Sequence, residues 1–284
     1  MKKLVVPAAA VVLLAASCST KNEVPENPEQ PKETWYLNGW TYNGTYGGST
    51  HYRYQVHYNP DSTVKQVDEF DGPLESSVMD YQHAMTYDNG QITALKYGDP
   101  GTILEDDRRF YYKDGKLVRI DHLKGQFSMT DSLYYNGSGN LTSNLRVHAG
   151  GSRMLDEIIT ENGNVMEVKK YDLNGGGKTL RATIRFKYDL LKMNPFKSVL
   201  KADYFFLVQS YVDLQWEYSA KNQPVYRTLE HAGSPGILDT MHFYFKYNDR
   251  QLLDSIRILD IERSGGLDRI VYENLYGLRY SKKQ

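Results

Sequence analysis

Apolar and polar residues alternate along most of the chain, as in β-strands that pack one face and leave the other in water. Every second residue from Tyr52 to Tyr58, and again from Met241 to Tyr247, is aromatic, Val or Met. The segment that ends at Tyr135 follows the same pattern, except that an acid, Asp131, takes one of its apolar positions. Because a convincing helical stripe with a 3.6-residue period is missing from the sequence, the pattern predicts an all-β fold.

A short unit recurs along the chain: a tyrosine, a polar turn and then an aliphatic residue. Pairs such as Asn-Gly and Asp-Gly adopt positive φ easily, which tight hairpin turns require. Each unit therefore predicts a strand, a turn and a strand, and eight copies predict an antiparallel meander of about sixteen strands. The copies are YNPDSTV (58–64), YDNGQI (87–92), YKDGKL (112–117), YNGSGNL (135–141), TENGNV (160–165), YDLLKMNPF (188–196), YSAKNQPV (218–225) and YNDRQLL (247–253).

Such a meander has three ways to arrange itself: a closed barrel, a folded sandwich or one continuous sheet. No long linker interrupts residues 35–284, which favours one domain. The expectation is an elongated, twisted single sheet that curls on itself, with two lobes meeting near residues 150–190 as a variant. Residues 190–205 are expected to form an irregular insertion, because Pro195 breaks regular structure.

The N-terminal segment predicts export. A basic start, Met1-Lys2-Lys3, precedes a short apolar run and small residues that end at Ser17. This is the pattern of a secretory signal peptide, and the run is too short to cross a membrane core, which needs about 20 residues. The cysteine that follows, Cys18, makes the segment resemble a lipobox, which implies removal of residues 1–17 and lipid on Cys18. An ordinary secretory signal is the alternative.

Residues 18–34 are polar and contain three prolines, so they predict an extended tether between the lipid and residues 35–284. Cys18 is the only cysteine, so the mature domain forms no internal disulfide. The chain has 34 basic and 35 acidic residues, which are interspersed, and this argues against a nucleic-acid partner. Its 24 tyrosines, at a mean hydropathy of −0.60, suit a sheet that is wet over much of its area.

The tyrosine-turn unit resembles the YD repeats of Rhs-type proteins. Together with the lipobox and the polar tether, it is similar to a family of Bacteroidales lipoproteins, and the segment RFKYDLLKMNPF (185–196) resembles that family's Tyr-Asp…Asn-Pro segment. The resemblance covers most of residues 35–284. It implies a lipid-anchored β-meander on the outer membrane, exposed at the cell surface, and carries no established activity.

The sequence offers little catalytic chemistry. Its seven histidines are scattered and form no metal-ligand motif, and no cofactor signature appears. Asp106 and Asp107 are adjacent, so in a strand they point to opposite faces. We therefore expect a non-enzymatic module that binds a glycan or an envelope protein, with Trp35, Trp40 and Trp216 as candidate aromatic contacts. The alternatives are a polysaccharide hydrolase with carboxylates from separate strands, or a structural spacer.

Four sites resemble the O-glycosylation sequon of exported Bacteroidales proteins, in which Asp precedes Ser or Thr. The predicted acceptors are Ser62, Ser132, Thr240 and Ser255. The alternative is that Asp-Ser and Asp-Thr belong to the strand repeat itself, because Ser132 and Thr240 fall within or next to predicted strands.

Overall fold

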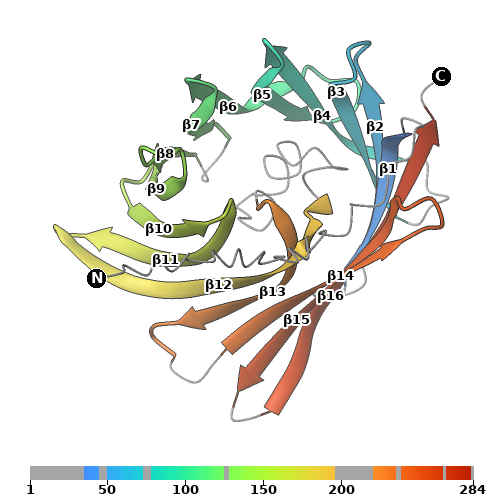
Figure 1. Cartoon of the computed structure of the whole chain (residues 1–284). Helices are drawn as coiled ribbons and strands as arrows, with labels where there is room; N and C mark the ends of the chain where they lie inside the picture. The colour runs from blue at the N-terminus through green and yellow to red at the C-terminus, as the bar shows by residue number, and fades with distance from the viewer. Residues whose placement is uncertain are drawn as a thin grey trace, which may run out of the picture. The chain divides into compact units, whose positions relative to one another are not determined.

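The structure is a computed structural model, and its described residues form one closed barrel of sixteen antiparallel strands in sequence order (Figure 1). The all-β fold and the meander are therefore confirmed. The described residues are 35–44, 50–72, 78–124, 128–195, 220–234, 238–264 and 267–282. Cys18, the tether and Trp216 lie outside them.

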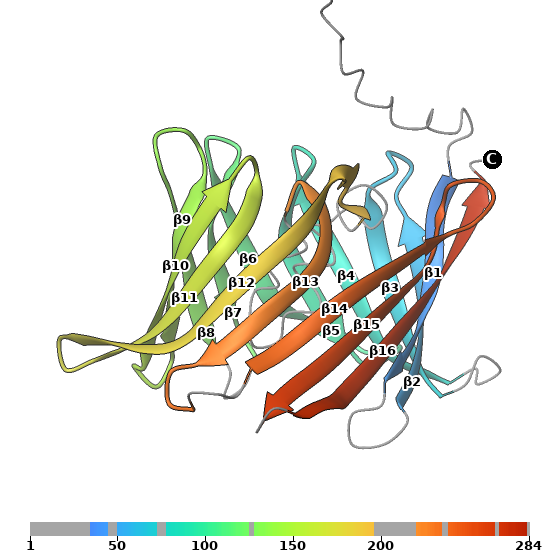
Figure 2. The ribbon, with the colours of Figure 1, turned by 60° about the horizontal axis from the view of Figure 1, so that its bottom comes forward.

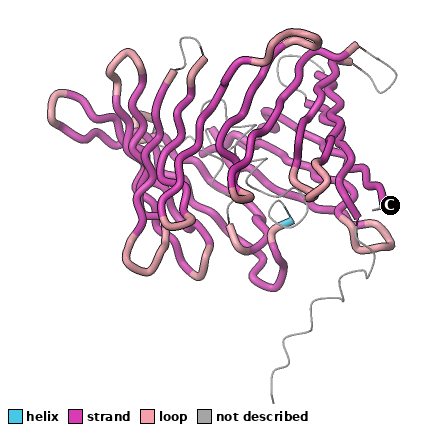
Figure 3. The backbone as a smooth tube through the Cα atoms, turned by 90° about the horizontal axis from the view of Figure 1, so that it is seen from above, coloured by secondary structure: helices cyan, strands magenta, loops and turns pink. Residues whose placement is uncertain are grey.

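The strands alternate in direction around the barrel, and the described turns between them lie at both ends (Figure 3). They are β1 (Trp35–Gly44), β2 (Thr50–Tyr58), β3 (Val64–Asp71), β4 (Met79–Asp88), β5 (Gln91–Gly98), β6 (Glu105–Lys113), β7 (Lys116–His122), β8 (Met129–Tyr135), β9 (Leu141–His148), β10 (Arg153–Glu161), β11 (Asn164–Asn174), β12 (Gly177–Met193), β13 (Asn222–His231), β14 (Leu238–Tyr247), β15 (Leu253–Ser264) and β16 (Leu267–Lys282).

The expectation of an open sheet is wrong, because the first and last strands pair. β1 and β16 run side by side from Trp35↔Lys282 to Gly44↔Asn274 (Figure 2). An open sheet with one apolar face needs a second layer to cover that face, and the described residues supply no helical layer. Closure puts the apolar face inside and leaves neither terminal strand with an unpaired edge.

Six of the eight predicted turns join neighbouring strands directly. The other two copies flank a single connection, from the end of β12 to the start of β13. In each of the six turns the tyrosine, or Thr160 in one copy, pairs across the hairpin with the aliphatic residue, next to a β-bulge: Tyr58↔Val64, Tyr87↔Ile92, Tyr112↔Leu117, Tyr135↔Leu141, Thr160↔Val165 and Tyr247↔Leu253. All these turns follow even-numbered strands, so they share one end of the barrel with Trp35 and Lys282.

The hydroxyls of these units tie successive hairpins together. Each donates a hydrogen bond to the backbone carbonyl of an aliphatic residue at the same end of the preceding strand, with which its own strand is paired. Such a bond satisfies two polar groups beside the packed core and adds about 1 kcal/mol. The bonds are Tyr58 to Leu37 (2.6 Å), Tyr135 to Leu117 (2.8 Å), Thr160 to Leu141 (3.1 Å), Tyr188 to Val165 (2.7 Å) and Tyr280 to Leu253 (2.9 Å).

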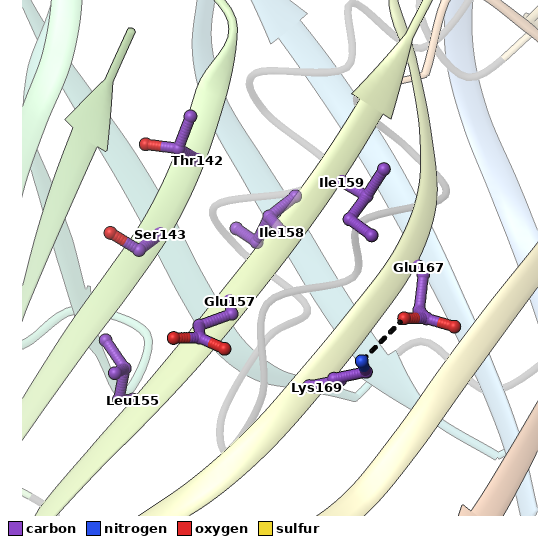
Figure 4. A pocket seen from close by; sticks show the side chains of 8 residues that line it. All are labelled: Thr142, Ser143, Leu155, Glu157, Ile158, Ile159, Glu167 and Lys169. Atoms are coloured by element: carbon purple, nitrogen blue, oxygen red, sulfur yellow. Dashed lines mark ion pairs between the residues drawn. The ribbon is translucent and has the colours of Figure 1, made fainter.

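The core lies on the inner face of the barrel. In β8, Met129, Asp131 and Leu133 are at most 6% exposed, whereas Tyr134 between them and the turn is 50% exposed. Figure 4 views β9–β12 from outside, and Glu157 projects from the wall toward the viewer. Alternation thus gives each strand one buried inner side and one outer side in contact with water. All the described strands except β9 and β13 contribute buried apolar residues to a single cluster.

We predict that Tyr135→Phe lowers the free energy of unfolding by about 1 kcal/mol, because it removes the hydrogen bond to the Leu117 carbonyl and leaves that carbonyl without its donor. Tyr134→Phe is the matched control, since Tyr134 is adjacent, on the outer face and half exposed. Urea unfolding of the two variants measures the difference. Equal stabilities would contradict the proposed role of the Tyr135 hydroxyl.

Candidate functional site

The inner wall of the barrel has two parts. Near the tyrosine turns it is lined by apolar side chains, among them Leu37, Val64 and Ile92. Further along the same inner faces, polar and charged side chains replace them. Those of β6 to β11 are largely buried: Arg108, His122, Asp131, Asn144, Arg146, Asp156 and Lys170.

Asp131 is the centre of a buried charged cluster. It is 0% exposed. His122 Nε2 lies 2.9 Å from Asp131 Oδ2, Asn144 Nδ2 donates to Oδ1 at 2.8 Å, and Arg146 Nε donates to Oδ1 at 2.8 Å. The acid that interrupts the apolar alternation is thus the acceptor for side chains from two neighbouring strands.

Burial alone would raise the pKa of Asp131. The hydrogen bond from His122, together with the charge and hydrogen bonds of Arg146 and the bond from Asn144, outweighs burial and holds that pKa far below its usual range. The carboxylate is therefore ionised at any physiological pH. Its role in the wall is structural, because its oxygens already accept these bonds and it has no contact with water.

A second polar region covers the inner faces of β2 to β5, at the end away from the tyrosine turns. Here Tyr52 pairs with Asp71 across β2 and β3, and Glu69 of β3 pairs with Tyr81 of β4. The side chains of Tyr52, Glu69 and Tyr81 are half-buried, whereas that of Asp71 is exposed. We call Tyr52, Tyr81, Glu69 and Asp71 the tyrosine–carboxylate wall. It combines flat aromatic surface with hydrogen-bond acceptors that reach water.

The outer wall carries a shallow pocket of about 330 Å³ over β9, β10 and β11 (Figure 4). Two of its carboxylates are ion-paired: Glu167 Oε1 lies 3.5 Å from Lys169 Nζ, and Glu157 accepts a bond from Lys178. The bond from Lys178 lowers the pKa of Glu157. A general acid of a glycosidase would need the opposite shift.

The predicted aromatic contacts are not brought together. Trp40 is 2% exposed on the inner wall and stacks on Tyr54, with 4.6 Å between the ring centroids, so its ring is not part of an exposed surface. Trp35 is half-buried at the start of β1, with the Arg250 guanidinium 4.8 Å from its ring. Sequence reasoning missed Tyr52 and Tyr81, because only the strand register places them beside the carboxylates of β3.

The four predicted glycosylation sites are all partly buried. Ser132, Thr240 and Ser255 are on the outer faces of β8, β14 and β15, and Ser62 is in the β2–β3 turn. The Ser62 hydroxyl lies 2.8 Å from the Tyr36 hydroxyl. Modification at these four residues stays a prediction.

Within the described part of the chain, no three His, Cys, Asp or Glu side chains are grouped as metal ligands. None of its helices has the length and apolar character needed to span a membrane.

No family model matches the chain, and no curated protein matches its sequence. Among solved structures, a porin-like protein from Bacteroides uniformis matches with a TM-score of 0.52 and 8% identity, over 87% of this chain and 98% of that one. A porin-like protein from Bacteroides vulgatus gives a TM-score of 0.38 and 12% identity, over 87% and 99%. The first match shows a common fold; the resemblance to YD-repeat lipoproteins stays a prediction.

We predict that Asp131→Asn lowers the free energy of unfolding by about 3–5 kcal/mol at pH 7, because it removes the buried negative charge to which Arg146 donates from Nε and Nη2. The folded-state pKa of Asp131 is depressed, so its contribution is present above pH ~4 and is lost as pH falls below that value. Urea unfolding should therefore show a smaller difference between wild type and variant at pH 3 than at pH 7.

Asp268→Asn is the control for this measurement. Asp268 also pairs with an arginine, at 2.6 Å from Arg263 Nε, but both side chains are more than half exposed. Exposed pairs contribute little to stability. An Asp131→Asn effect no larger than that of the control would contradict the buried cluster.

Proposed function

We propose that this protein is an exported, lipid-anchored barrel whose outer wall faces water and whose inner wall binds a ligand. The observation that carries the proposal is the charge on the outer wall. Cys18 supplies the anchor, residues 19–34 the tether, and the outer membrane is the proposed location, from the lipobox and the family resemblance. The proposed role is binding, without catalysis.

Ion pairs occur on the outer faces all around the barrel. A barrel wall in contact with lipid carries an apolar band about 25 Å tall, and one Arg or Lys at its midplane costs about 2–4 kcal/mol. Here charged pairs sit on the middle of the strands, where such a band would have to run. Examples are Arg119–Asp121 (2.7 Å), Arg185–Glu167 (3.0 Å) and Arg257–Glu273 (2.6 Å).

The inner wall shows the converse arrangement. Membrane barrels that conduct solutes have a polar interior. In this barrel the inner half next to the tyrosine turns is a packed apolar core, in which Val67, Val168 and Leu253 are 0% exposed. Apolar groups inside and charges outside are the arrangement of a protein that is surrounded by water.

The similarity to a porin-like protein supports the barrel fold, and fold alone does not define function. What the inner wall offers a ligand is its polar end, the tyrosine–carboxylate wall. Glycan and protein are the two partner classes that we expect. A spacer role would leave this wall without a ligand.

The proposal predicts that the lipid is the only membrane attachment. A site for a specific protease is inserted into residues 19–34 of the full chain, membranes are isolated, and the protease is added without detergent. The barrel should then appear in the soluble fraction. Membranes that carry the uncut site are the control and should keep the protein in the pellet. A cleaved barrel that stays in the pellet until detergent is added would contradict a water-facing outer wall.

A further inference from the structure

We propose that the tyrosine–carboxylate wall binds a carbohydrate that is neutral or carries amino groups, and excludes acidic carbohydrates. This inference rests on the proposed function, because it names the ligand of that inner wall. The site consists of Tyr52 on β2, Glu69 and Asp71 on β3, and Tyr81 on β4.

The register places these side chains in two adjacent rows. Tyr52 is directly opposite Asp71, and Glu69 is directly opposite Tyr81. Opposite residues on one face of an antiparallel pair have Cβ atoms about 4.5–5.5 Å apart. A tyrosine ring therefore lies on each side of the carboxylates of β3, one from β2 and one from β4.

Each ring is held in orientation by a second tyrosine. Tyr52 stacks on Tyr42 of β1, with ring centroids 6.2 Å apart and planes inclined by 24°. Tyr81 stacks on Tyr97 of β5 at 4.8 Å and 26°. Two aromatic platforms thus stand in fixed orientations with part of their surface in contact with water. Preorganised rings bind a flat ligand with little loss of side-chain entropy.

The wall is electrostatically negative. Burial raises the pKa of Tyr52, and the charges of Asp71, Glu69 and Asp80 raise it further. Burial also raises the pKa of Asp80, followed by the charges of Glu69 and Asp71. These shifts show that the three carboxylates act on the same volume, where an anionic ligand would be repelled.

Among the described residues, His83 and Lys124 border the wall, and both are engaged. His83 Nε2 lies 3.1 Å from Glu69 Oε2, and Lys124 Nζ lies 4.9 Å from the centroid of the Tyr97 ring. Lys124 also donates to the Tyr97 carbonyl at 3.0 Å. They do not form a cluster that would attract a carboxylate or sulfate group of an acidic glycan.

A sugar ring suits this combination. Its apolar C–H face packs on an aromatic ring, and its hydroxyls donate hydrogen bonds to carboxylates, which are stronger acceptors than neutral groups. An ammonium group would gain further from the carboxylates and from the faces of Tyr52 and Tyr81. Because the wall combines rings for stacking with carboxylate acceptors, the expected ligands are carbohydrates that are neutral or carry amino groups.

The test uses the full lipidated chain in mild detergent and three oligosaccharide classes: neutral xylo-oligosaccharides and manno-oligosaccharides, chitosan oligosaccharides, and oligogalacturonides. Binding is measured by calorimetry. We expect binding in the neutral or amino class and none to oligogalacturonides. Tyr52→Ala and Tyr81→Ala should each weaken binding by about tenfold, which corresponds to one lost stacking contact.

Tyr111→Ala is the matched control, because Tyr111 is 41% exposed on the outer face of β6 and should leave affinity unchanged. Tyr52→Phe keeps the ring and should bind within about threefold of wild type, which separates loss of stacking from loss of folding. Binding of oligogalacturonides, silence of both other classes, or binding that Tyr52→Ala and Tyr81→Ala leave intact would overturn the inference. The protease-release assay decides the water-facing barrel independently of each of these results.

Discussion

The hydrogen bond from a strand-end hydroxyl to the carbonyl of the preceding unit is the interaction on which the barrel depends. It recurs from Tyr58, which reaches back to Leu37 on β1, to Tyr280, which reaches back to Leu253 from the last strand. Each bond joins two neighbouring strands at the end of the barrel that carries the tyrosine turns. Because the bonds continue onto both terminal strands, β1 and β16 are brought into line to pair and close the wall.

The local pattern predicted the strands and most turns, because alternation and Asn-Gly chemistry act over a few residues. The count of about sixteen strands holds for the described residues, although two of the eight units flank one connection. The units therefore account for β2 to β15, and β1 and β16 complete the barrel by pairing with each other as well as with β2 and β15. Closure depends on contacts such as Trp35↔Lys282, which local periodicity does not contain. Because the sequence does not show which face closure turns inward, Trp40 was predicted to be an aromatic contact on the surface.

The candidate site shows the same limit. Asp131 was visible as an acid at an apolar position, but its partners come from neighbouring strands and needed the register. The pairing of Tyr52 with Asp71 likewise exists only across two strands. The distribution of charge is the basis for proposing a water-facing barrel: ion pairs such as Arg257–Glu273 lie outside, and the apolar core lies inside. The same barrel fold can have its outer wall in water or in lipid, and the side chains on that wall determine which.

The central claim is that the outer wall faces water, and spin-label accessibility in native membranes tests it most directly. Cys18 is the only cysteine and is committed to lipid in our account, so single cysteines introduced at Thr93, Thr228 or Tyr244 on the outer faces take up one nitroxide each. The account predicts that a water-soluble nickel chelate relaxes all three labels strongly and that membrane-dissolved oxygen relaxes them weakly. Strong oxygen relaxation with protection from the chelate would contradict it.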